Sequence, residues 1–208
     1  MNAPDLIRRR LSGDFTVDPW GLDRDVIEAV SPMAALRWNI EVSGRPLPDG
    51  PAVVVFNRRF GLSEPAVVSE AVRQASDRDL RIVGLPDLPV LGPTLRRFGA
   101  VIDHPEEVAS LLREGALVGV PLGLEPRHRH QAGPLVPDSL TPAVASGVPV
   151  VPLVAVGREI GRHWRVVVGE PLPSPERDDP LTATRLAEAA QAAVQTLLDA
   201  TLPPRFLG

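Results

Sequence analysis

Short apolar segments that alternate with helical patterns constrain the fold of this chain most strongly. The runs over 52–56, 116–120 and 148–156 are continuously apolar and rich in β-branched residues. Runs of this kind are typical of strands that are buried on both faces of a sheet. Helical patterns separate them. Strands that alternate with helices predict an α/β fold with a mostly parallel central sheet flanked by helices.

The other elements follow from periodicity and from start and stop signals. We predict helices over 23–38, 64–74, 90–98, 105–113, 140–146 and 181–202, and further strands over 38–42, 80–85, 100–103 and 164–168. Pro32 is expected to kink or divide the first helix, because proline removes a helical hydrogen bond. The stretch 121–142 is long for a connection, so we expect a functional loop or lid there.

Composition limits the classes of function. The 208 residues fit one domain, which we place at 13–208 after a flexible N-terminal segment over 1–12. The chain has no cysteine and no lysine, which excludes thiol nucleophiles and Schiff-base chemistry. A net charge of -4 gives no reason to expect a nucleic-acid partner. No apolar run approaches the roughly 20 residues that span a bilayer, so we expect a cytoplasmic protein with at most peripheral membrane contact.

Four short motifs occur in a characteristic order. They are Val53-Val54-Val55-Phe56-Asn57, Gly99-Ala100-Val101-Ile102-Asp103-His104, Val120-Pro121-Leu122-Gly123 and Val148-Pro149-Val150-Val151-Pro152. With the lead-in over 13–21, they resemble the glycerolphosphate and lysophosphatidic acid acyltransferase family over most of the chain. The resemblance implies an acyltransferase-type α/β single domain.

The catalytic motif of that family is His-x-x-x-x-Asp. The histidine takes the proton of the acceptor hydroxyl and the aspartate orients the imidazole. The resemblance places Arg58 at the histidine position and Ser63 at the aspartate position. Arginine stays protonated at any usable pH and cannot act as this base. Since no His-x-x-x-x-Asp occurs elsewhere in the chain, we predict a catalytically inactive member.

The same resemblance identifies substrate-binding positions. His104 stands where active members use an arginine to hold the substrate phosphate, and Leu122 stands where they use a glutamate. The implied substrate-binding set is Arg58, Arg59, Gly99, His104, Pro121, Leu122 and Gly123. We expect no metal site and no cofactor, because the histidine pair His128 and His130 has no nearby acid or cysteine pattern.

Three functions remain open at this point. The favoured one is a binding or regulatory module that holds an acyl chain, an acyl thioester on coenzyme A or an acyl carrier, or an anionic phospholipid-like ligand, or that acts with a protein partner. The second is an active acyltransferase with a site rebuilt around His104, or around His128 and His130. The third is a structural protein with a filled cleft, which differs from the first by the lack of a pocket beside Arg58.

Overall fold

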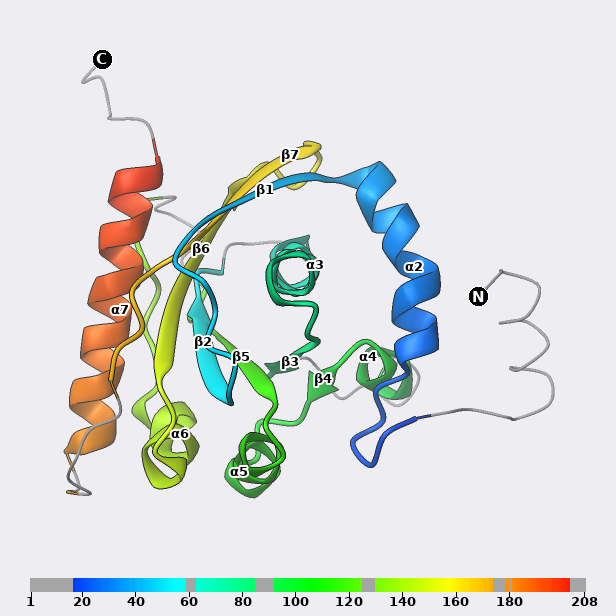
Figure 1. The fold of residues 1–208 in the computed structure, drawn as a ribbon. Coiled ribbons are helices and arrows are strands. Elements are labelled where there is room, and N and C mark those ends of the chain that lie inside the picture. Colours follow the sequence, from blue (N-terminus) through cyan, green and yellow to red (C-terminus); the bar gives the residue numbers. More distant parts are fainter. Residues whose placement is uncertain are drawn as a thin grey trace, which may run out of the picture.

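A computed structural model describes residues 17–58, 63–84, 92–124, 130–173, 179 and 181–202. Seven strands in these ranges form one twisted sheet in the order β1-β7-β6-β2-β5-β3-β4 (Figure 1). Within it only β6 and β7 run antiparallel, and the other neighbours are parallel. The strands are β1 (Asn39–Gly44), β2 (Ala52–Phe56), β3 (Leu80–Val83), β4 (Ala100–Val101), β5 (Leu117–Pro121), β6 (Val150–Gly157) and β7 (His163–Val168).

Helices cover both faces of the sheet (Figure 1). The helices are α2 (Arg24–Arg37), α3 (Ser63–Ser76), α4 (Gly92–Arg97), α5 (Pro105–Arg113), the 3-10 turn η1 (Pro137–Leu140), α6 (Thr141–Ser146) and α7 (Thr182–Thr201). Helices α5, α6 and α7 pack on one face, and α3 packs on the other. Helix α2 lies outside α3, so that α3 stands between α2 and the sheet (Figure 1).

Strand β2 shows how the sequence produces these layers. All five of its residues are buried, and successive side chains of a strand point to opposite faces. Val53 and Val55 join the core under α5, α6 and α7. Val54 and Phe56 join the core under α3. A strand between two cores needs an apolar residue at every position, which explains the uninterrupted run.

The predicted architecture is confirmed, with local corrections. Pro32 neither divides nor ends the first helix, which runs through it from Arg24 to Arg37. The strand predicted over 100–103 ends at Val101, and the one predicted from 148 begins at Val150. The N-terminal segment 1–12 lies outside the described residues. No helix in the described ranges is both long and apolar enough to cross a membrane.

Where the structure describes the stretch 121–142, this segment packs against the rest of the domain. The Gly123 amide donates to the Pro134 carbonyl at 2.7 Å, and a side chain on Gly133 would collide with the Gly123 backbone. Leu135 and Leu140 are buried in the core. Residues 125–129 are outside the described part, so the lid stays a prediction. The segment that follows, 130–142, is anchored to the rest of the domain.

Candidate functional site

The end of β2 is fixed by one buried side chain. Asn57 is 3% exposed. Its amide nitrogen donates to the Ala155 carbonyl at 3.0 Å, and its amide oxygen accepts from the Ala155 amide at 2.7 Å. These two bonds extend the pairing of β2 with β6 beyond Phe56. The next residue, Arg58, therefore leaves the sheet at a defined position and is half-buried.

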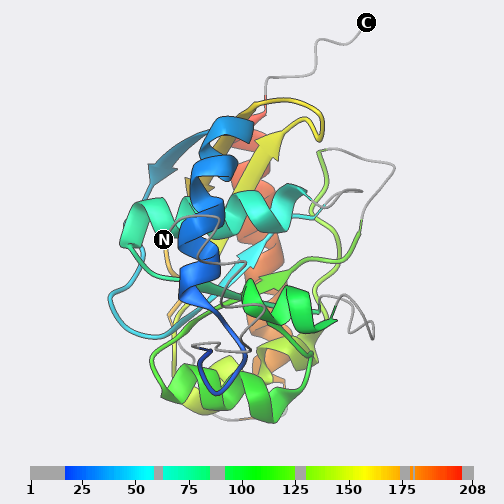
Figure 2. The same ribbon diagram turned by 90° about the vertical axis from the view of Figure 1, so that its right-hand side faces the viewer.

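An apolar cavity of about 420 Å³ opens beside Arg58. It lies between α2 and α3, with β3 and α4 contributing the remaining walls. Figure 2 shows α2 passing in front of α3. The residues that line it are Ile27, Val30, Ser31, Ala34, Trp38, Arg58, Pro65, Ala66, Ser69, Glu70, Arg73, Asp79, Leu80, Ile82, Leu95 and Phe98.

The cavity exists because α2 does not pack closely on α3. Ile27, Val30 and Ala34 recur at helical spacing along α2 and all face the cavity. None of the α2 residues is buried. An apolar helix face that meets a space instead of side chains leaves a cleft of the kind that takes small molecules.

Polar contacts hold α2 in place at its C-terminal end. Arg37 donates to the carbonyl oxygens of Glu159 and Gly161 at 2.8 and 2.7 Å. In return, Arg162 donates to the Leu36 carbonyl at 2.8 Å. The turn between β6 and β7 and the end of α2 are thus tied to each other.

Most charged groups in the cavity wall already have partners. Arg73 forms a two-pronged contact with Glu70, at 3.1 Å from Nε and 2.7 Å from Nη2, and it also donates to the Ser31 hydroxyl. The hydrogen bond to Glu70 is the largest cause of a raised pKa for Arg73. Asp79 is paired with Arg24 at 3.0 Å.

Two hydrogen-bond donors in the wall have no acceptor. The Nε of Arg58 and the indole Nε1 of Trp38 are both buried, and neither has a hydrogen-bond partner among the described residues. Both residues line the apolar cavity. An unsatisfied buried donor costs free energy of about 1–3 kcal/mol. The cavity wall therefore lacks hydrogen-bond acceptors for these two donors.

The amino end of α3 is occupied by a carboxylate. Glu159, in the turn after β6, accepts from the Ser63 amide at 3.1 Å and from the Ser63 hydroxyl at 2.7 Å with the same oxygen. Helix N-termini favour such an anion, because their first amides lack helical partners. Glu159 has no local signal in the sequence, because it contacts Ser63 from 96 positions further along the chain.

The other expected substrate-binding residues are not among the described residues that line the cavity. Leu122 is 1% exposed and packs in the core under α5, α6 and α7. Its amide donates to the Phe56 carbonyl at 2.8 Å, which keeps Pro121 and Gly123 close to the end of β2. Their assignment to substrate binding stays a prediction.

Gly99 and His104 lie at the far edge of the sheet. Gly99 has φ +89°, and a Cβ there would lie 2.8 Å from the Leu80 carbonyl oxygen, so glycine is required by the backbone. His104 is exposed at the N-cap of α5 and makes no side-chain cap bond. Arg59 and His128 lie outside the described residues.

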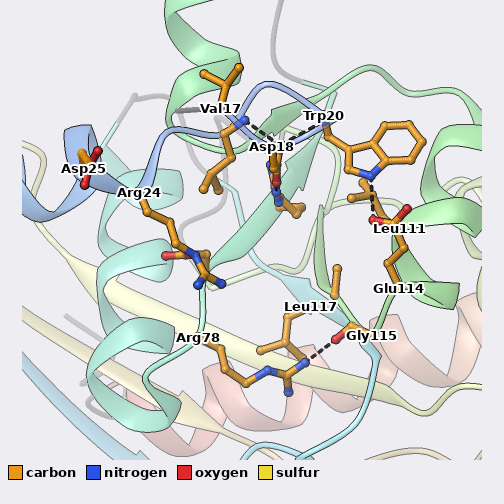
Figure 3. A pocket seen from close by; sticks show the side chains of 14 residues that line it. Val17, Asp18, Trp20, Arg24, Asp25, Arg78, Leu111, Glu114, Gly115 and Leu117 are labelled. Carbon is orange, nitrogen blue, oxygen red and sulfur yellow. Dashed lines mark hydrogen bonds and ion pairs between the residues drawn. The ribbon is translucent and has the colours of Figure 1, made fainter. Parts of the chain in front are cut away.

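A second cavity, of about 510 Å³, lies at the amino ends of β3 and β5 (Figure 3). Its polar groups are largely matched to one another. The Trp20 indole donates to Glu114 at 2.9 Å, and Arg78 donates to the carbonyls of Pro48, Gly50 and Gly115. Such contacts fasten loops together, so we assign this cavity a structural role.

Arg81 is the most buried charge beside that second cavity. It is 7% exposed and pairs with Asp18. Burial lowers the pKa of Arg81 to about 10, with the charge of Glu114 acting in the opposite direction. The guanidinium is still charged at neutral pH, and its Nη1 has no hydrogen-bond partner among the described residues.

The fold matches a solved acyltransferase. The structure aligns with the 1-acyl-sn-glycerophosphate acyltransferase PlsC from Thermotoga maritima at a TM-score of 0.61, over 86% of this chain and 81% of that chain, with 16% sequence identity. The chain has a PlsC-like acyltransferase fold. No family model matches the sequence.

Relatives of the PlsC-like chain are found among mycobacterial proteins. It is 28% identical to the uncharacterized protein Rv0502 of Mycobacterium tuberculosis, in an alignment of 255 residues that covers 93% of this chain and 71% of that protein. The uncharacterized protein ML2427 of Mycobacterium leprae is also 28% identical. These relatives are uncharacterized and name no activity.

Proposed function

We propose that this PlsC-like chain binds an acyl chain without transferring it. The observation that carries the proposal is an apolar cavity of about 420 Å³ lined by Arg58, the residue that the family resemblance places at the position of the catalytic base. The volume lies within the range of about 300–1,000 Å³ that is usual for ligand sites. The cavity also separates this function from that of a structural protein with a filled cleft.

The surroundings of His104 and His163 support the absence of transfer. A rebuilt site needs a histidine that a carboxylate orients. His104 is exposed at the start of α5. His163 is also exposed, and its ring nitrogen lies 3.4 Å from the Asn39 amide.

We expect no enzymatic release of thiol from long-chain acyl-coenzyme A. The folded protein would be mixed with glycerolphosphate and lysophospholipid acceptors and a chromogenic thiol reagent. Because the chain contains no cysteine, it adds no background to the signal. Acyl carrier protein donors complete the assay. Release above the uncatalysed rate that is abolished by His104→Ala, or by His128→Ala together with His130→Ala, would contradict the proposal and point to a rebuilt site.

Ala66→Trp is expected to block the cavity. Ala66 lines the cavity on α3 and its residue surface is exposed, so a larger side chain can enter the open space without displacing the core. We expect binding of hexadecanol, measured by calorimetry, to weaken at least about tenfold, since the bulky ring removes apolar surface that the chain would bury. The melting temperature should change little.

Ala192→Trp is the matched control. Ala192 is exposed on α7, which packs on the opposite face of the sheet (Figure 1). The same substitution there should leave binding unchanged. Equal binding by wild type and Ala66→Trp would place the ligand elsewhere.

A further inference from the structure

The polar atoms of the apolar cavity specify the head group of its ligand. The two buried polar atoms of its wall that lack a hydrogen-bond partner among the described residues are donors, the Arg58 Nε and the Trp38 Nε1. A head group that satisfies them must present acceptors. Carboxylates, phosphates and carbonyls offer acceptors, whereas an alcohol also brings an O–H donor that needs an acceptor of its own.

Charge narrows the choice among these acceptors. The guanidinium of Arg58 is positive at any usable pH, and no ion pair joins it to another described residue. The charged neighbours in the cavity wall are matched to each other, Glu70 to Arg73 and Asp79 to Arg24. A neutral thioester carbonyl leaves the Arg58 charge uncompensated. An anionic head neutralises it through a charge-assisted hydrogen bond, which is stronger than a neutral one.

The carboxylate at the start of α3 argues for a head of single charge. The amides that begin α3 are the natural place for the extra charge of a phosphate. Glu159 already fills that place through its two bonds to Ser63. A phosphate with two charges would therefore carry one charge that the Arg58 guanidinium does not neutralise. A carboxylate carries one charge, which the single guanidinium of Arg58 matches.

We propose that the cavity binds a free long-chain fatty acid, with its carboxylate on Arg58 and its alkyl chain along α3. This inference rests on the proposed function and names its ligand class. The lining residues Pro65 and Arg73 are eight positions apart on α3, which corresponds to about 12 Å of helix. The cavity thus follows the helix as an elongated slot that suits a linear chain. Trp38 supplies the second donor.

The test compares head groups on one alkyl chain. Calorimetry would measure the binding of hexadecanoate, hexadecanol, methyl hexadecanoate, hexadecanoyl-coenzyme A and a hexadecanoyl lysophosphatidic acid to the wild-type protein, each below its micelle concentration. We expect hexadecanoate to bind at least about tenfold more tightly than the alcohol and the ester. Equal binding of the acid, alcohol and ester would overturn the carboxylate inference and leave acyl-chain binding intact.

The lysophosphatidic acid and the coenzyme A thioester also test the inferred head group. Tighter binding of the lysophosphatidic acid or of the coenzyme A thioester than of hexadecanoate would also overturn the inference. Binding of none of the ligands would overturn the proposed function together with it. These results come from the unmodified protein, so they hold whatever the variants do.

Arg58→Gln is expected to erase the preference for the acid, so that hexadecanoate and hexadecanol bind the variant with similar affinity. The matched control is Arg158→Gln, an exposed arginine of the turn after β6 that does not line the cavity. It should keep the preference. A preference that survives Arg58→Gln in a protein with wild-type circular dichroism, or that Arg158→Gln also removes, would contradict the role of Arg58.

Discussion

Leu122→Glu is expected to lower the free energy of unfolding by about 4 kcal/mol or more. The substitution restores the glutamate that the family resemblance places at this position. Leu122 is 1% exposed in the core under α5, α6 and α7. The change removes a buried leucine and places a carboxyl group among apolar side chains, and each of these is unfavourable. Urea unfolding followed by circular dichroism measures the effect.

Leu122→Met is the control, since it nearly conserves volume and should cost less than about 1.5 kcal/mol. A Leu122→Glu protein as stable as wild type would mean that the side chain reaches solvent at this position. The expected instability has a consequence for function. A glutamate-bearing site cannot be restored here by one substitution, because the surrounding core has been built around an apolar residue.

Asp18→Asn is expected to lower the free energy of unfolding by about 3 kcal/mol. The Asp18 Oδ1 accepts from the amides of Trp20 and Leu22, at 2.9 Å each, and asparagine can keep both bonds. Only the negative charge beside Arg81 is lost. Removing the partner of a buried charge is strongly destabilising. The 32% exposure of the Asp18 side chain and the remaining charge of Glu114 keep the effect at the lower end of the expected range. Thermal and urea unfolding at neutral pH test this.

The double variant Asp18→Asn/Arg81→Met separates charge from packing. It removes the orphaned guanidinium and should recover most of the lost stability. Glu170→Gln is the surface control, because its pair with Arg45 has side chains that are 70% and 65% exposed. We expect that change to cost about 0.5 kcal/mol or less. An Asp18→Asn effect as small as this would contradict the buried-pair account.

The sequence predicts most of the fold because its strongest signals are local. The run over 52–56 predicts β2, and Gly115 marks the end of α5, where φ is +86°. The continuity of the first helix through Pro32 has a physical reason. The proline lies in a helix that is exposed on its outer side and packs loosely on its inner side, so no neighbouring core enforces a break.

The candidate site is less predictable because three long-range contacts define it. The position of Arg58 directly after β2 follows from the local apolar run over 52–56. Trp38 joins the cavity only because α2 folds over α3, and Glu159 reaches Ser63 from the turn after β6, a strand that neighbours β2 in the sheet but lies far from it in the sequence. The burial of Leu122 depends on which face of the sheet it meets. None of these three contacts can be recognised from the local spacing of residues in the sequence.

The loose packing of α2 links binding to folding. This helix is tied by Arg37, Arg162 and Ser31 through polar contacts, and none of its residues is buried. When these polar contacts open, water replaces the lost hydrogen bonds at little cost in free energy. Without a ligand, α2 is therefore held only weakly against α3. An alkyl chain in the cavity would supply the apolar partner for Ile27, Val30 and Ala34. The bound alkyl chain would then bury the apolar face of α2, which the protein itself leaves uncovered. This burial would stabilise α2 in its place over the cavity.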